Sequence, residues 1–115
     1  MPIPPELEAF IERLNLELGQ IEQKTSVGLN LARELLSRIP DNAILIQNLA
    51  YFNAALFFVN SSRQQIETII NSTSTSETSI NQIQETGEDL GTLFGQALEV
   101  KLRVERLVVR LEEQL

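Results

Sequence analysis

The chain has 115 residues, of which 43% are hydrophobic and 22% are charged, as expected for one folded domain rather than a disordered segment. Its net charge of −7 argues against binding to nucleic acid or to an anionic membrane. The sequence contains no Cys and no His, so it lacks thiolate chemistry, the commonest general base and the commonest metal ligand, and we expect no enzyme activity, metal or cofactor.

The N-terminus has neither a basic region nor an apolar run, so it does not resemble a signal peptide, and we expect a cytoplasmic protein. A first helix is predicted from about residue 5 to residue 39, because Pro5 suits a first helical turn and apolar residues then recur at alternating spacings of three and four. The middle of this seam is a notch of small residues, Thr25, Gly28 and Ala32.

A second helix is predicted from about residue 42 to residue 71. The Pro40 ring ends the first helix, and Asp41 is the expected N-cap of the second. The turn is short, so the two helices should be antiparallel. Residues 42–62 carry no formal charge, which predicts that this helix is the middle one and is covered on more than one side.

Three apolar residues of this helix lie off its two core-facing stripes and are hard to place inside a single bundle: Ile46, Ala50 and Phe57. A membrane span is not expected, because Gln, Asn and Ser side chains interrupt the charge-free stretch and no positive cluster flanks it.

A polar loop is predicted over residues 72–79, followed by a third helix from about residue 78 to residue 113. Either Ser79 with Gln82 or Ser74 with Glu77 can form a capping box at its start. Three helices of similar length joined by short turns predict an all-α fold, namely a single-domain, elongated, antiparallel up-down-up bundle with coiled-coil-like packing over residues 1–115.

Three glycines recur every four residues on the third helix, at Gly87, Gly91 and Gly95. Each costs about 1 kcal/mol relative to Ala in a helix interior, so a compensating contact is expected. Three contacts remain open: aromatic rings of the second helix against these glycines and the notch, a groove for another helix, or a pocket for a small apolar ligand.

The basic residues of the third helix include Arg103, Arg106 and Arg110 on one helix face. Intrahelical pairing with Glu99 and Glu113 explains most of this cluster, and an acidic partner surface or DNA are the alternatives. The carboxylates at positions 85, 88 and 89 are interpreted as a solvated acidic face rather than as metal ligands.

Three segments carry a resemblance: the Pro-Pro-Glu-Leu opening, the Leu-Leu-Ser-Arg-Ile-Pro-Asp-Asn-Ala turn and the Ala-Leu-Phe-Phe-Val core. Together they resemble small all-helical bacterial proteins, of the kind found in cyanobacteria. The resemblance implies a helical fold and no particular activity. The long helices are also similar to the spacers of type I restriction specificity subunits, but the DNA-reading domains of that family are absent.

These observations favour a non-enzymatic protein that acts by protein–protein association, either with itself as a homodimer or as an adaptor for another protein. The candidate interface comprises residues of the second and third helices: Ile46, Ala50, Phe57, Gly87, Gly91 and Gly95. The alternatives are a bundle that binds a small apolar ligand and a DNA-associated accessory coiled-coil protein.

Overall fold

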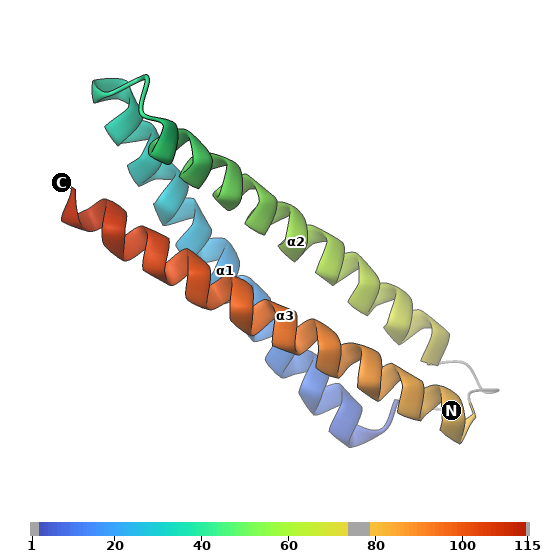
Figure 1. The fold of residues 1–115 in the computed structure, drawn as a ribbon. Coiled ribbons are helices and arrows are strands. Elements are labelled where there is room, and N and C mark those ends of the chain that lie inside the picture. Colours follow the sequence, from blue (N-terminus) through green and yellow to red (C-terminus); the bar gives the residue numbers. More distant parts are fainter. Residues whose placement is uncertain (1–2, 74–78, 115) are drawn as a thin grey trace.

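The computed structural model describes residues 3–73 and 79–114, and they form three long helices (Figure 1). These are α1 (Pro5–Arg38), α2 (Ala43–Thr73) and α3 (Ile80–Glu113). They run up, down and up in a rod with extents of 58 × 18 × 16 Å. The predicted all-α three-helix bundle is confirmed.

The ends of the helices follow from local sequence. Pro5 occupies the first turn of α1, where its missing N–H needs no partner. The expected cap of α2 was wrong by one residue, since Asn42 Oδ1 rather than Asp41 accepts the Leu45 N–H at 3.0 Å. The predicted capping box at α3 is confirmed, because Ser79 and Gln82 exchange two hydrogen bonds. The alternative box at 74 and 77 lies outside the described residues.

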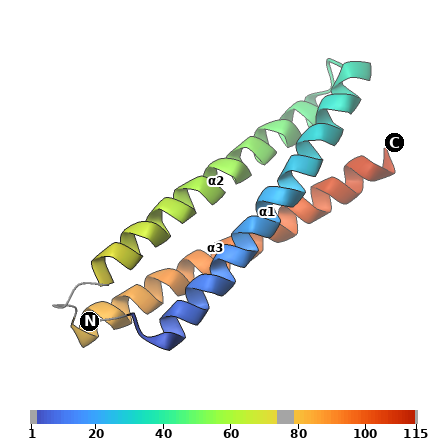
Figure 2. The same cartoon turned by 180° about the vertical axis from the view of Figure 1, so that it is seen from behind.

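The middle helix of the bundle is α1, which corrects the prediction that the charge-free second helix is central. Helix α1 packs along both other helices, whereas α2 and α3 touch each other much less (Figure 2). The reason lies in the side chains of α1, whose seam is buried from Ile11 to Leu35 and whose flanking charged groups reach both neighbours. Because α2 has fewer neighbours than expected, one of its faces remains open to solvent.

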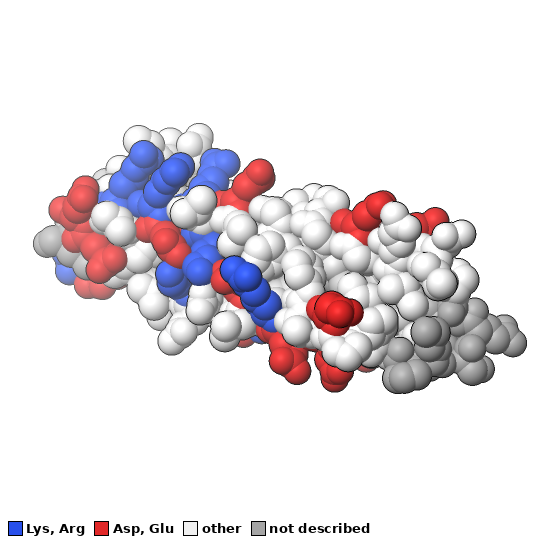
Figure 3. Space-filling model, turned by 90° about the horizontal axis from the view of Figure 1, so that it is seen from below, with Lys and Arg blue, Asp and Glu red and all other residues white. Residues whose placement is uncertain are grey.

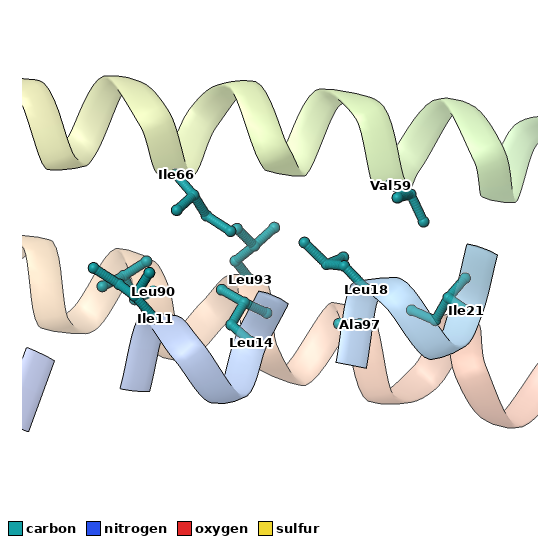
Figure 4. Close-up of a cluster of buried hydrophobic side chains, with 9 residues drawn as sticks. All are labelled: Ile11, Leu14, Leu18, Ile21, Val59, Ile66, Leu90, Leu93 and Ala97. Atoms are coloured by element: carbon teal, nitrogen blue, oxygen red, sulfur yellow. The ribbon is translucent and has the colours of Figure 1, made fainter. Parts of the chain in front are cut away.

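The core consists of two clusters along the rod axis. One lies towards the first turns of α1 and α3, where all three helices contribute (Figure 4); its buried members are Ile11, Leu14, Leu18, Ile21, Val59, Ile66, Leu90, Leu93 and Ala97. The other lies towards the 39–42 turn; its buried members are Leu29, Ala32, Leu35, Leu45, Phe52, Ala55, Val104 and Leu111. These residues occupy the predicted core-facing stripes of the three helices, apart from Leu29, which lies beside the seam of α1.

The notch of α1 receives an aromatic ring, as the sequence predicts. Phe52 is completely buried and lies against Gly28. A Cβ atom at Gly28 would lie 2.6 Å from Phe52 Cε1 and 2.8 Å from Cε2, well inside van der Waals contact. The glycine therefore permits α1 and α2 to approach closely at this level. Because Phe52 packs this closely against Gly28, its ring occupies the notch. A small apolar ligand would have had to bind at the same place.

Candidate interaction surface

The side of α2 that faces away from the bundle carries a row of exposed, uncharged residues. We call this row the α2 outer face; it comprises Ala43, Ile46, Ala50, Asn53, Phe57 and Asn60. Among its large side chains, Ile46 is 50% exposed and Phe57 is 74% exposed. The expectation that Ile46, Ala50 and Phe57 do not fit inside one bundle therefore corresponds to their exposure to solvent.

The chemistry of this face differs from an ordinary solvated helix surface. No residue from 42 to 62 carries a formal charge, so the outer face lacks the Lys and Glu side chains that normally cover an exposed helix. Within the described residues, α2 is the one helix whose length and composition would allow it to cross a membrane, with 28% of its most apolar window buried. Core helices of soluble proteins pass the same test. Large exposed apolar patches mark sites of interaction with a protein or a membrane, or ligand-binding grooves.

The glycine face of α3 occupies a different place from the one predicted. Cβ atoms at Gly91 and Gly95 would meet nothing within 4 Å, and both residues are exposed. A Cβ atom at Gly87 would lie 3.7 Å from Leu7 Cδ2 of α1. The expectation that aromatic rings of α2 pack against these glycines is wrong, because the stripe borders α1 and then faces solvent.

The basic residues of α3 do not form the predicted intrahelical pairs. Within residues 3–73 and 79–114, neither Glu99 nor Glu113 makes an ion pair with an arginine. The Arg103 guanidinium instead lies 4.4 Å from the centre of the Tyr51 ring, a cation–π contact that joins α3 to α2. Arg106 is exposed and, like Arg110, has no carboxylate partner in the described part of the chain.

Among the described residues, the Tyr51 phenol has a pKa that departs clearly from its ordinary value. Its pKa is raised above 10.0 because burial disfavours the phenolate. The neighbouring Arg103 guanidinium acts in the opposite direction and offsets part of that rise. Of these two effects on the phenolate, burial is the larger.

Within residues 3–73 and 79–114, three ion pairs join α1 to its neighbours. Lys24 Nζ lies 2.6 Å from Glu105, and Lys101 Nζ lies 2.8 Å from Glu17, so two pairs link α1 to α3. The third joins α1 to α2, where Arg63 contacts Glu22 at 2.7 Å. The pair between Lys101 and Glu17 is the most buried of the three, so Lys101 is neutralised by α1 and does not add to the basic face of Arg103, Arg106 and Arg110.

Charge is distributed unevenly along the rod. When each helix is divided at its midpoint, the half that contains the 39–42 turn has seven acidic and seven basic side chains, and we call it the neutral half. The other half, the acidic half, has two arginines and eight carboxylates within the described residues, namely Glu6, Glu8, Glu12, Glu17, Glu67, Glu85, Glu88 and Asp89. Figure 3 shows Lys and Arg gathered over the end of the rod that carries the C-terminus of α3. The α2 outer face belongs almost entirely to the neutral half.

Groups of three or more metal-ligating side chains that could hold a metal ion do not occur within the described residues. On the face of the acidic half that Figure 3 shows, the carboxylates lie apart from one another. Within the described residues, two features of the surface bear on function: the α2 outer face, and Arg106 and Arg110, which are exposed and lack a carboxylate partner there.

No protein-family model, curated protein or solved structure matches this chain.

Proposed function

We propose that this protein is a non-enzymatic helical bundle that works by protein–protein association through the α2 outer face. The observation that carries the proposal is a solvent-facing apolar row, with Ile46 and Phe57 as its large members, inside a 21-residue stretch without a formal charge. Self-association is the form of association that we favour, and service as an adaptor for another protein is the alternative.

The energetics support an interface at this position. Burial of a Phe or Ile side chain contributes about 1.5–3 kcal/mol, and aromatic residues are enriched at interface cores, where charged residues are depleted. Phe57 is the most exposed aromatic ring in the described chain, so it gains the most from coverage. Elsewhere the chain uses 25 charged residues to solvate its surface, and their absence from α2 leaves this face suited to contact with protein.

The test is a substitution that places a charge in the centre of the row. Phe57→Glu should dissociate the assembly and leave the helix content unchanged, because residue 57 makes little contact inside the bundle. Leu102→Glu is the matched control: Leu102 is 52% exposed on α3, and a glutamate there can pair with Arg106 one turn later. Mass by light scattering and helix content by circular dichroism are measured on all three proteins.

The expected result is a concentration-dependent dimer for the wild type and the control, and a monomer for Phe57→Glu. A Phe57→Glu protein with the mass of the wild-type assembly would contradict the proposed interface. A monomeric wild type at every concentration would contradict self-association.

A second candidate function rests on the two arginines of α3 that lack carboxylate partners within residues 3–73 and 79–114. Arg106 and Arg110 are both exposed and lie one turn apart, so they could dock an acidic surface of another protein. Binding of polyglutamate and of duplex DNA is measured at low ionic strength, with the double variant Arg106→Gln and Arg110→Gln as the comparison. Equal binding by the variant, or no binding at all, would remove this candidate.

A further inference from the structure

We propose that two copies of the chain pair through the α2 outer face in an antiparallel arrangement, with a two-fold axis that passes between the levels of Tyr51 and Phe52. This inference rests on the self-association proposed above and adds the orientation and the register of the two copies.

The first step is the spacing of the outer face. Its residues lie at positions 43, 46, 50, 53, 57 and 60, so the intervals alternate between three and four. This is the spacing of a coiled-coil seam, in which one stripe of a helix meets a second helix along its whole length. Helix α2 therefore carries one such seam towards α1 and α3 and a second one towards solvent. A second seam indicates that the partner on this side is another helix.

The second step is the register. The row can meet a copy of itself in the antiparallel direction. In the proposed register the numbers of any two facing residues add up to 103, so Ile46 faces Phe57 of the second copy. The same register places Ala50 opposite Asn53 of the second copy. At the outer layer, Ala43 faces Asn60 of that copy. Every member of the row then has a partner from the row. Such self-complementarity is what an interface with two-fold symmetry requires.

The sizes of the side chains fit this register. The two large residues, Ile46 and Phe57, meet each other on both sides of the axis, and the small residues lie at the centre, where the two backbones can approach. The Asn53 side chains of the two copies lie only about 4.5 Å apart along the helix axes, at 1.5 Å per residue. An amide group both donates and accepts hydrogen bonds, so the two can pair across the axis. The row contains two Asn residues, Asn53 and Asn60, and a polar residue in a helix–helix seam restricts the registers that the seam can adopt.

The charge distribution favours the antiparallel orientation over the parallel one. In this register the two neutral halves overlap, and the two acidic halves point in opposite directions. A parallel pair would place the two acidic halves side by side, each with eight carboxylates and two arginines in the described chain. Repulsion between these carboxylates opposes the parallel pair, whereas the uncharged rows have no such repulsion in either orientation.

The size of the seam sets the strength of the association. From Ala43 to Asn60 the row is about 26 Å long, and a helix is about 10 Å wide, so the contact falls at the small end of specific protein interfaces. We expect a dissociation constant in the micromolar range, and the monomer and dimer should interconvert with concentration.

Disulfide cross-linking tests the register directly, because the chain has no cysteine of its own. Two single variants are made, Ala43→Cys and Asn60→Cys, which leave Ile46 and Phe57 intact. In the proposed register the two cysteines face each other across the interface when the variants are mixed. In either variant alone, the cysteines of the two copies lie about 25 Å apart along the axis, whereas a disulfide requires Cα atoms within about 7 Å.

The expected result is rapid formation of a covalent dimer in the mixture and none in either variant alone. Addition of Phe57→Glu to both variants should abolish it. Cross-linking of Ala43→Cys alone would show a parallel pair and overturn the inference. A wild-type dimer by mass with no cross-link in the mixture would also overturn it while leaving self-association intact. A wild-type monomer at every concentration would instead overturn the proposed function on which the inference rests.

Discussion

The bundle contains a buried glycine, Gly28, and an exposed one, Gly91, and substitution by Ala should change stability in opposite directions at the two positions. Ala is favoured over Gly in a helix interior by about 1 kcal/mol. At Gly91 nothing lies within 4 Å of a new Cβ atom, so Gly91→Ala should stabilise the fold by about that amount. At Gly28 the Cβ atom would overlap the ring of Phe52, which is completely buried.

Overpacking of a core costs about 1–3 kcal/mol, and an overlap with rigid ring carbons belongs at the upper end of that range. After the helix-propensity gain is subtracted, Gly28→Ala should destabilise the protein by about 1–2 kcal/mol. For a domain of this size the melting temperature changes by about 4 °C per kcal/mol, so it should fall by about 4–8 °C in Gly28→Ala and rise by about 4 °C in Gly91→Ala.

The assay is thermal unfolding followed by circular dichroism at one fixed protein concentration, since association would shift the melting temperature. The double variant Gly28→Ala with Phe52→Leu provides the internal check, because leucine lacks the ring carbons that overlap the new methyl group. Its loss of stability should be smaller than the sum of the two single losses. An increase in melting temperature for Gly28→Ala equal to that of Gly91→Ala would refute the close packing of Phe52 on α1.

Two further predictions concern polar groups in the bundle. The Thr25 hydroxyl is buried and has no hydrogen-bond partner among the described residues. Thr25→Val should therefore raise the free energy of unfolding, measured by denaturant titration, by about 1–3 kcal/mol. A lower free energy of unfolding in the variant would show that the hydroxyl has a partner. Tyr51 is the single tyrosine and the chain has no tryptophan. A pH titration followed by phenolate absorbance therefore measures the pKa of Tyr51 without a contribution from another residue. Because that pKa is raised above 10.0 in the folded state, the stabilisation by the neutral phenol is complete below pH 10 and is lost as the pH rises through the folded pKa. Arg103→Met should raise the pKa of Tyr51 further, and an unchanged or lower value would contradict the cation–π contact.

The fold could be predicted from the sequence because its determinants are local or periodic. The alternating seam of α1, Pro40 in the first turn and the Ser79–Gln82 capping box each act through neighbours in the chain, and the structure confirms all three. The packing of an aromatic ring into the notch was also predictable, because a notch of small residues at one level of a helix requires a large residue opposite.

The arrangement of the three helices could not be predicted in the same way. The absence of charge from residues 42–62 suggested burial, but a helix can also be uncharged because it faces another molecule, and the sequence alone does not distinguish these cases. In the structure α1 is the middle helix, and its charged flanks form ion pairs on both sides, with Glu22 to α2 and Lys24 to α3. Such pairs depend on which helices are neighbours, and periodicity carries no information about that.

The candidate site was predicted in part. The spacing of α2 correctly set Ile46, Ala50 and Phe57 apart from the core stripes. The prediction that the α3 glycines pack against aromatic rings was wrong. A stripe of small residues has the same pattern in the sequence whether it packs against a ring or faces solvent. The cation–π contact between Arg103 and Tyr51 was missed, since it joins residues 52 positions apart on helices whose relative rotation the sequence does not fix.

The central claim is that the exposed, uncharged row on α2 is an interface between two copies of the chain. It is tested most directly by the mass of the wild-type protein in solution, measured by light scattering coupled to size exclusion over a tenfold range of concentration. The account predicts a mass that rises with concentration from the 13.0 kDa monomer towards twice that value, and a constant monomer mass for Phe57→Glu. A wild-type mass that stays at the monomer value throughout, or a Phe57→Glu protein that dimerises like the wild type, would contradict it.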